Sequence, residues 1–301
     1  MHVRSSDSKL IWDSYISEEQ QDLDIGQKLA DLVQETINIA DEATNPWWSN
    51  CVKTMLSHLI PHNNPAQGTT MGVDKDGNVY VNLDFVARQL SDDPSGATVR
   101  GTFYHEAMHI ANYSWDRVGD RDHQLWNVAT DYVMNSTLAR SGITLPAGGL
   151  LPERRGELDI IVFNPADYGI SGWEGDVEID ITGMAAEHVY SALVRQLNKM
   201  DQKKDPEAGD SGDELGPAGR AVADGLSKQS GNEGGDFEVE GIEKLRQEAR
   251  DKTEEDLKND KQKREKVRDL EGGQEALEDM GLDDEDDEDN KQDYGDSGDG
   301  D

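Results

Sequence analysis

Apolar residues over much of the chain recur every three or four positions, which places them on one face of a helix. Residues 1–17 show no such spacing and are predicted to form a loose lead-in. One helix is predicted from Glu18 to Ala43, and another begins after Pro46 and ends before Pro61. The same spacing predicts further helices over Leu83–Leu90, Thr98–Tyr113, Asp122–Ser141 and Met184–Met200.

Between Thr69 and Phe85 the apolar period changes from helical to alternating. Met71–Val73 and Asn78–Asn82 flank Asp74–Gly77, and an Asp-Gly turn between alternating runs predicts a β-hairpin. The spaced acids of this turn also resemble a calcium loop. The loop lacks the bidentate Glu that would close such a site, so a plain turn is favoured.

An irregular stretch rich in Gly, Pro and acidic residues runs from Leu145 to Gly183. Only Asp159–Phe163 within it is predicted to be a strand. Long ordered loops in compact domains commonly serve a binding site, so this stretch is predicted to wall a cleft. The whole pattern predicts an α+β domain over residues 18–200, mainly helical with a small β-hairpin.

Beyond residue 200 the composition shifts toward Gly, Ser and charged residues. Residues 201–240 have the composition of a flexible linker. Residues 241–301 are predicted to form a charged tail, partly helical and then disordered, either solubilising or docking on a basic protein partner. Its apolar stripe is too thin for a core, which predicts a solvated single helix or one that folds on a partner. That stripe consists of Ile242, Leu245, Leu257, Val267 and Leu270.

The net charge of the chain limits the classes of partner that it is expected to bind. The 301 residues carry a formal net charge of −35 at pH 7, of which about −20 lies in residues 201–301. Such a field repels phosphates, so direct nucleic-acid binding is not expected. The one cysteine, Cys51, fits a reducing compartment. The sequence shows no apolar leader and no apolar run of membrane length, so we expect a cytoplasmic protein, in the host cytosol if a phage encodes it.

The sequence His105-Glu106-Ala107-Met108-His109 is the strongest candidate for chemistry. On a helix, two imidazoles four residues apart share one face and reach one cation, while Glu106 lies close enough to act on a metal-bound water. The alternative is a polar stripe on a surface helix. The surrounding apolar residues, including Phe103 and Ile110, favour a packed helix and therefore a metal site.

Two histidines leave zinc one protein ligand short, and Asp131 is the best candidate for the third. Asn127, Asp131 and Asn135 recur every four residues on an otherwise apolar helix, so the amides are candidates for orienting Asp131 or a neighbouring imidazole. His123 is the weaker rival ligand. An interhelical polar network is the structural alternative.

Other histidines and tyrosines are weaker candidates for the functional site. His58 and His62 are expected to be structural or to face solvent. An oxyanion donor could come from His188, Tyr168 or Tyr190, and the sequence does not choose among them.

The run from Tyr104 to Leu197 resembles the putative metallopeptidase domain family of bacteria and phages, in which a von Willebrand factor A-like domain often follows. Two departures stand out: Ser114 occupies a place where another His is expected, and an acidic tail replaces the second domain. The matching pieces are His105–His109, Arg117, Trp126–Asn135, Gly142–Pro146 and Ala186–Leu193, with Gly77–Asn82 in the place of the strand before the active-site helix.

The motif and the resemblance together imply a zincin-like metallopeptidase. Zn²⁺ would be held by His105, His109 and Asp131, and Glu106 would act as general base on the metal-activated water that hydrolyses a peptide or protein substrate. The strand Val79–Asn82 is expected to pair with the substrate backbone. A second functional class remains possible from the sequence: the protein could be a catalytically inactive, metal-stabilised adaptor that acts through its acidic tail. The incomplete ligand set favours the enzyme, because structural zinc sites are usually closed by four protein ligands.

Overall fold

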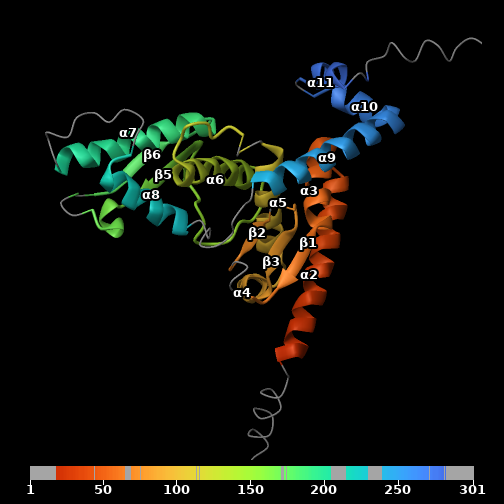
Figure 1. The fold of residues 1–301 in the computed structure, drawn as a ribbon, viewed down its shortest axis with the longest axis horizontal. Coiled ribbons are helices and arrows are strands. Elements are labelled where there is room, and N and C mark those ends of the chain that lie inside the picture. The colour runs from red at the N-terminus through yellow and green to blue at the C-terminus, as the bar shows by residue number, and fades with distance from the viewer. Residues whose placement is uncertain are drawn as a thin grey trace, which may run out of the picture.

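The protein is a mixed α+β structure, mainly helical with small sheets, as predicted (Figure 1). The computed structural model describes residues 18–43, 45–64, 69–74, 76–112, 114, 116–170, 173, 175–204, 215–229, 239–270, 272–280 and 282. The predicted lead-in at 1–17 and the acidic end from 283 onward lie outside these residues. Among the helices described, none combines the length and the apolar character needed to cross a bilayer.

The two helices predicted near the N-terminus are present as α2 (Glu18–Asp41) and α3 (Pro46–Ser57). Asn45 starts α3, because its side chain accepts hydrogen bonds from the backbone N–H groups of Trp47 and Trp48. Pro46 adds the fixed φ that suits a first helical position. The apolar faces of α2 and α3 meet in one core cluster with the first sheet and the motif-bearing helix.

The predicted hairpin is confirmed as β2 (Met71–Val73) and β3 (Val79–Asn82), which pair antiparallel. Gly77 adopts a φ of 82° in the turn, where Asp74 Oδ1 accepts the backbone N–H groups of Asp76 and Asn78 at 2.9 Å. The carboxylate is therefore occupied by the donors of its own turn, which agrees with a plain turn.

The position of β3 corrects the prediction that this strand pairs with substrate. A further strand that the sequence pattern did not predict, β1 (Leu59–His62), runs parallel to β3, and the order in the sheet is β1-β3-β2. Both edges of β3 are thus hydrogen-bonded within the protein. Within the described residues of this sheet, an extended peptide could add only at β1 or β2.

The next helices, α4 (Leu83–Asp92), α5 (Ala97–Ala111) and α6 (His123–Arg140), carry the cleft. Asn82 couples β3 to α4 by accepting the backbone N–H of Phe85 at 3.1 Å. Gly101 in α5 allows a close approach, because a Cβ there would lie 1.9 Å from the carbonyl oxygen of Thr144. The chain that follows α6 therefore lies directly against the motif-bearing helix.

The stretch 145–183 contains more structure than predicted. Besides β5 (Leu158–Phe163), which contains the predicted strand, it forms β4 (Glu153–Arg155), a 3₁₀ turn (Pro165–Tyr168) and β6 (Val177–Asp180), in the order β4-β5-β6. β6 alternates buried and exposed residues, a signal present in the sequence, whereas β4 is exposed at every position and offers none. With α7 (Ala186–Lys204), the buried faces of β5 and β6 build a second core cluster around α6.

The predicted flexible linker is corrected where the structure describes it, and so is the prediction that the apolar stripe beyond residue 240 is too thin to pack in a core; the predicted helix in that charged segment is present. Within the supposed linker, α8 (Pro217–Gln229) buries Val222 and Leu226 in the second core cluster. α9 (Val239–Asn259) buries Ile242, Leu245 and Ala249 in the first cluster. A thin stripe suffices because α9 covers a surface that α3 and α5 already form, rather than building a core of its own.

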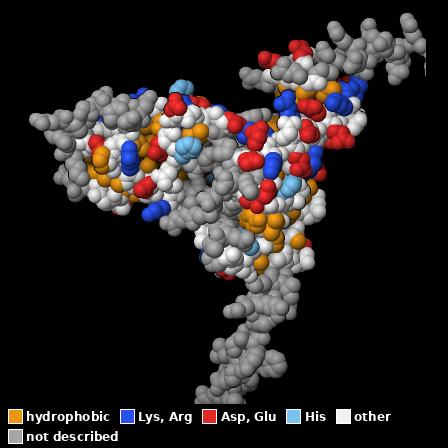
Figure 2. Space-filling view, viewed as in Figure 1, with side chains coloured by type: hydrophobic (Ala, Val, Ile, Leu, Met, Phe, Trp, Pro, Cys, Tyr) orange, Lys and Arg blue, Asp and Glu red, His pale blue; other side chains and the backbone are white. Residues whose placement is uncertain are grey.

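The end of this segment forms two short helices, α10 (Lys261–Arg268) and α11 (Gly273–Asp279). Their buried residues Val267 and Leu277 make a small separate cluster with Leu257 of α9. Charged side chains of both signs cover the outer faces of these helices (Figure 2). The dense charge that suggested a solvated tail therefore describes an outer face only.

Arg246 of α9 reaches the motif-bearing helix. The side chain is 5% exposed, forms ion pairs with Asp116 and Glu243, and donates from Nε to the carbonyl oxygen of Ile110 at 3.4 Å. Ile110 follows the second histidine of the motif. A cation at the C-terminal end of a helix is electrostatically favourable, so α9 stabilises the end of α5.

Leu245→Ala tests whether α9 belongs to the core. The side chain is 1% exposed, so its truncation is expected to lower the free energy of unfolding by about 2–5 kcal/mol. Leu270→Ala is the matched control, because Leu270 is 37% exposed and its loss should change stability by about 0.5 kcal/mol or less. Urea unfolding measures both. Equal, small effects would mean that α9 is detached in solution.

Candidate metal centre

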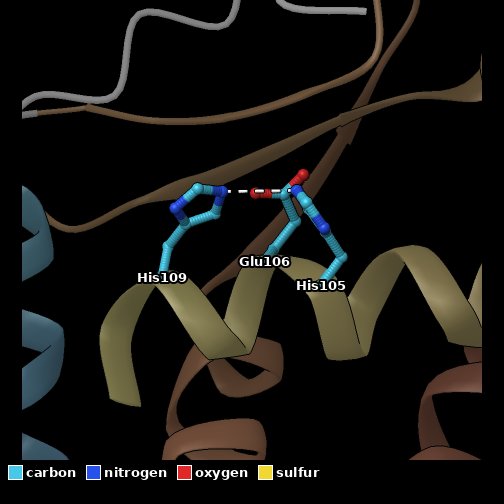
Figure 3. Close-up of side chains that lie close together, drawn as sticks. All are labelled: His105, Glu106 and His109. Carbon is cyan, nitrogen blue, oxygen red and sulfur yellow. Dashed lines mark hydrogen bonds between the residues drawn. The ribbon is translucent and has the colours of Figure 1, made fainter. Parts of the chain in front are cut away.

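The side chains of His105, Glu106 and His109 project from the same side of α5 (Figure 3). The histidines lie one turn apart, and their Nε2 atoms are 3.3 Å from each other. The ring planes meet at 83° with centroids 5.0 Å apart, so the two rings converge edge to face. A local helical spacing thus brings two nitrogen ligands to one point.

Asp131 arrives at the same point from α6. Its Oδ1 lies 3.4 Å from Nε2 of His109 and 3.6 Å from Nε2 of His105. The residue is 2% exposed, and among the described residues Oδ1 has no hydrogen-bond partner. A buried carboxylate oxygen without a donor is costly, so this arrangement favours an external cation.

The separations test whether these residues suit a metal ion. Ligand atoms 2.0–2.2 Å from one tetrahedral zinc ion lie about 3.3–3.6 Å apart, and the three donor atoms of His105, His109 and Asp131 are 3.3, 3.4 and 3.6 Å apart. Atoms of His105, Glu106 and His109 also lie within 4.8 Å of one another, a wider grouping. The tighter triangle makes Asp131 the better third ligand and leaves Glu106 beside it.

Asn135 fixes the orientation of His105. Asn135 Nδ2 donates to the carbonyl oxygen of Leu150 at 3.0 Å, which turns Oδ1 toward the imidazole. His105 Nδ1 lies 2.7 Å from that oxygen and therefore donates to it. The proton on Nδ1 leaves the Nε2 lone pair facing His109 and Asp131, the tautomer that a metal ligand requires.

Glu106 is half-buried beside the triangle, and its buried Oε2 atom has no hydrogen-bond partner among the described residues. Burial raises the pKa of its carboxyl above the ordinary value, the charges of His105 and His109 oppose this rise, and Asp131 adds to it. Burial alone would lower the pKa of His109, but Asp131 and Glu106 outweigh it and raise that pKa. A carboxylate with a raised pKa is suited to accepting and returning a proton near neutral pH.

A cavity of about 220 Å³ opens onto these side chains. Its lining includes all four predicted site residues, Asn135, and the segment Leu145–Leu151, here called the cleft wall. The prediction that this part of the chain would wall a cleft is therefore confirmed for Leu145–Leu151. The lining also includes Phe85 and Gln89 of α4 and Thr102 of α5.

The other predicted polar residues lie elsewhere. His123 is exposed at the start of α6, about 12 Å along the helix from Asp131. Tyr190 accepts the backbone N–H of Asp122 at 3.0 Å, Tyr168 packs on Phe163, and neither lines the cavity; nor does His188. Asn127 is buried one turn before Asp131 and is also absent from that lining.

The two remaining histidines have structural surroundings. His58 Nε2 lies 2.7 Å from a Glu248 carboxylate oxygen, and the His62 ring packs edge-on against Tyr80. This agrees with the structural reading of both residues.

The sequence did not single out Phe85, Gln89 or Thr102 as cavity residues. Thr102 stands one turn before Glu106, so its place on the same helical face could have been found from spacing alone. The carbonyl oxygen of Leu150 carries no side-chain signal, and only the fold brings it to Asn135.

Asn135→Ala is expected to weaken zinc binding about 10- to 100-fold, because the variant frees the imidazole of His105 to rotate and change tautomer. Asn135→Asp keeps the acceptor for His105 but loses the donor to the carbonyl oxygen of Leu150, so it should restore only part of the affinity. Asn127→Ala, from the same helix but outside the cavity lining, serves as the control. Competition with a chromophoric chelator measures all three. If Asn135→Ala bound zinc as tightly as the wild type, Asn135 would have no role in orienting His105.

Comparisons with known proteins agree with this chemistry. No curated protein and no solved structure matches the chain. One family model matches residues 61–293, more than three quarters of the sequence, and its description is "putative metallopeptidase domain". The match spans β2 to α11 and so includes both helices of the candidate centre and α9. The chain belongs to this metallopeptidase domain family.

Proposed function

We propose that this protein is a zinc-dependent endopeptidase with a zincin-like active site. The observation that carries the proposal is the nearly equilateral triangle of donor atoms from His105, His109 and Asp131, with Glu106 beside it in a cavity. Three protein ligands leave a fourth position of a tetrahedral ion for water or substrate, whereas structural zinc sites are usually closed by four protein ligands. The arrangement therefore favours catalysis over a purely structural metal.

When bound, zinc would lower the pKa of water and polarise a carbonyl group. The residues of the chain supply the remaining functions. Glu106 accepts the proton of the attacking water and returns it to the leaving amine, and the pKa of its carboxyl, raised above the ordinary value, suits both steps. Asn135 holds the tautomer of His105, and the cleft wall confines the substrate beside Glu106.

Hydrolysis of an unstructured, fluorescently labelled protein by the zinc-loaded chain tests this function. Cleavage is expected with zinc, its loss after treatment with 1,10-phenanthroline, and its recovery when zinc is restored. The proposal would be contradicted if the protein bound one zinc per chain but cleaved none of a broad set of peptides. The metal would then be structural, and the protein would be an adaptor.

A further inference from the structure

The cavity is uncharged apart from its proposed catalytic centre. Among the described lining residues, Glu106, Asp131 and the two histidines are the only ionisable side chains. The Thr102 hydroxyl already donates to the carbonyl oxygen of Thr98 at 3.1 Å. A charged substrate side chain placed against the rest of this lining, away from the catalytic centre, would lose its hydration without gaining a counter-charge, which is unfavourable.

The apolar lining comes from two parts of the chain. Phe85 belongs to α4, and Leu145, Leu150 and Leu151 belong to the cleft wall. Apolar groups that converge on a small cavity favour an apolar ligand group, because burial removes apolar surface from water on both partners.

The cleft wall is held at both ends. Leu145 packs against the core cluster that contains α5, and Leu150 is 1% exposed in the cluster that contains α6. Asn135 binds the carbonyl oxygen of Leu150, and Gly101 lets Thr144 approach α5 closely. A wall fixed in this way keeps one shape, and a preformed shape discriminates among side chains better than a mobile one.

We propose that the cleft selects extended polypeptides that place an uncharged, apolar side chain beside the bond to be cut, an inference that rests on the proposed peptidase function. The cavity of about 220 Å³ equals roughly seven water volumes. That space holds one apolar side chain and its adjoining peptide group but not a folded segment. The substrate is therefore locally unfolded where it is cut.

Leu151 offers a direct way to change this selectivity. It lines the cavity yet is 38% exposed, so Leu151→Lys introduces a cation without removing a core side chain. Leu158→Lys is the matched control, because Leu158 is 44% exposed on β5 and does not line the cavity. A lysine at 151 supplies the missing counter-charge, and the cleft should then accept acidic side chains.

The experiment uses fluorescent alanine-based hexapeptides that carry Leu, Gln, Asp or Lys at one varied position. Cleavage by the zinc-loaded protein is followed by mass spectrometry. Binding to the zinc-loaded Glu106→Gln variant is followed by fluorescence anisotropy, with the Leu151→Lys or Leu158→Lys change added to the same background. The binding measurement does not depend on turnover.

Leu peptides are expected to be cut next to Leu and to bind at least about 10-fold more tightly than Asp peptides. Leu151→Lys should shrink that ratio several-fold, whereas Leu158→Lys should leave it unchanged. Cleavage with equal use of Leu, Asp and Lys peptides would overturn the inference while the peptidase function stands. Selective binding of Leu peptides without any cleavage would overturn the peptidase function and leave the selectivity of the cleft. If the peptides were neither cleaved nor bound selectively, both the peptidase function and the selectivity of the cleft would be overturned.

Discussion

Glu106→Gln is expected to retain zinc and to lose peptide hydrolysis by roughly 10²–10⁴-fold, the usual contribution of a positioned general acid–base group. Glutamine keeps the size of the side chain but cannot accept a proton from water. Glu106 is not one of the three donors of the tighter triangle, so the metal content of the variant should match that of the wild type. The kcat of the variant and its zinc content are the two measurements.

The control for this variant is Glu157→Gln, a change of the same chemical kind at a carboxylate that is 93% exposed outside the cavity. It should hydrolyse peptides at the wild-type rate. If Glu106→Gln were equally active, Glu106 would have no part in proton transfer. If the variant lost zinc together with activity, Glu106 would be a ligand, as its inclusion in the wider grouping of metal-binding atoms allows.

Asp131→Asn is expected to weaken zinc binding by at least about 100-fold, since the loss of a direct ligand should exceed the 10- to 100-fold effect of losing a supporting hydrogen bond. The change has opposite effects on the two forms of the protein. Without metal, and at a pH above the raised pKa of His109 where that imidazole is neutral, the buried carboxylate oxygen lacks a donor, so the neutral amide should leave the apo protein equally or more stable. With metal, only the wild type gains stability.

Thermal unfolding with and without zinc measures both effects of the substitution on stability. Zinc at a thousand times its dissociation constant should stabilise the wild type by about 4 kcal/mol, and the variant should show almost none of this gain. Asp122→Asn is the control on the same helix, because asparagine also serves as an N-cap and residue 122 lies outside the cavity lining. A variant that zinc stabilised as strongly as the wild type would exclude Asp131 as a ligand.

The sequence predicted best where the relevant contacts are local. His105, Glu106 and His109 lie within five residues of one helix, so helical geometry alone places them together. Asp131 was found from a polar stripe on an apolar helix, again a local signal. The hairpin β2–β3 followed from alternation and an Asp-Gly turn.

Contacts between distant segments left little trace in the sequence. The packing of α9 was missed because Leu245 needs only a few apolar neighbours on its own helix when α3 and α5 provide the other side of the contact. Nothing in the sequence distinguishes Arg246 from the other charged residues of its segment, and only the fold places it on the carbonyl oxygen of Ile110. The bidentate pair between Arg117 and Glu187, at 2.9 and 2.7 Å, likewise joins residues 70 positions apart.

We infer that His105, His109 and Asp131 hold one catalytic zinc ion. The metal content of the full chain, purified without a metal-affinity tag and measured by mass spectrometry beside His109→Ala, tests this inference. About one zinc per wild-type chain and almost none in the variant are expected. Wild-type protein that binds no metal even after zinc is supplied would exclude this site.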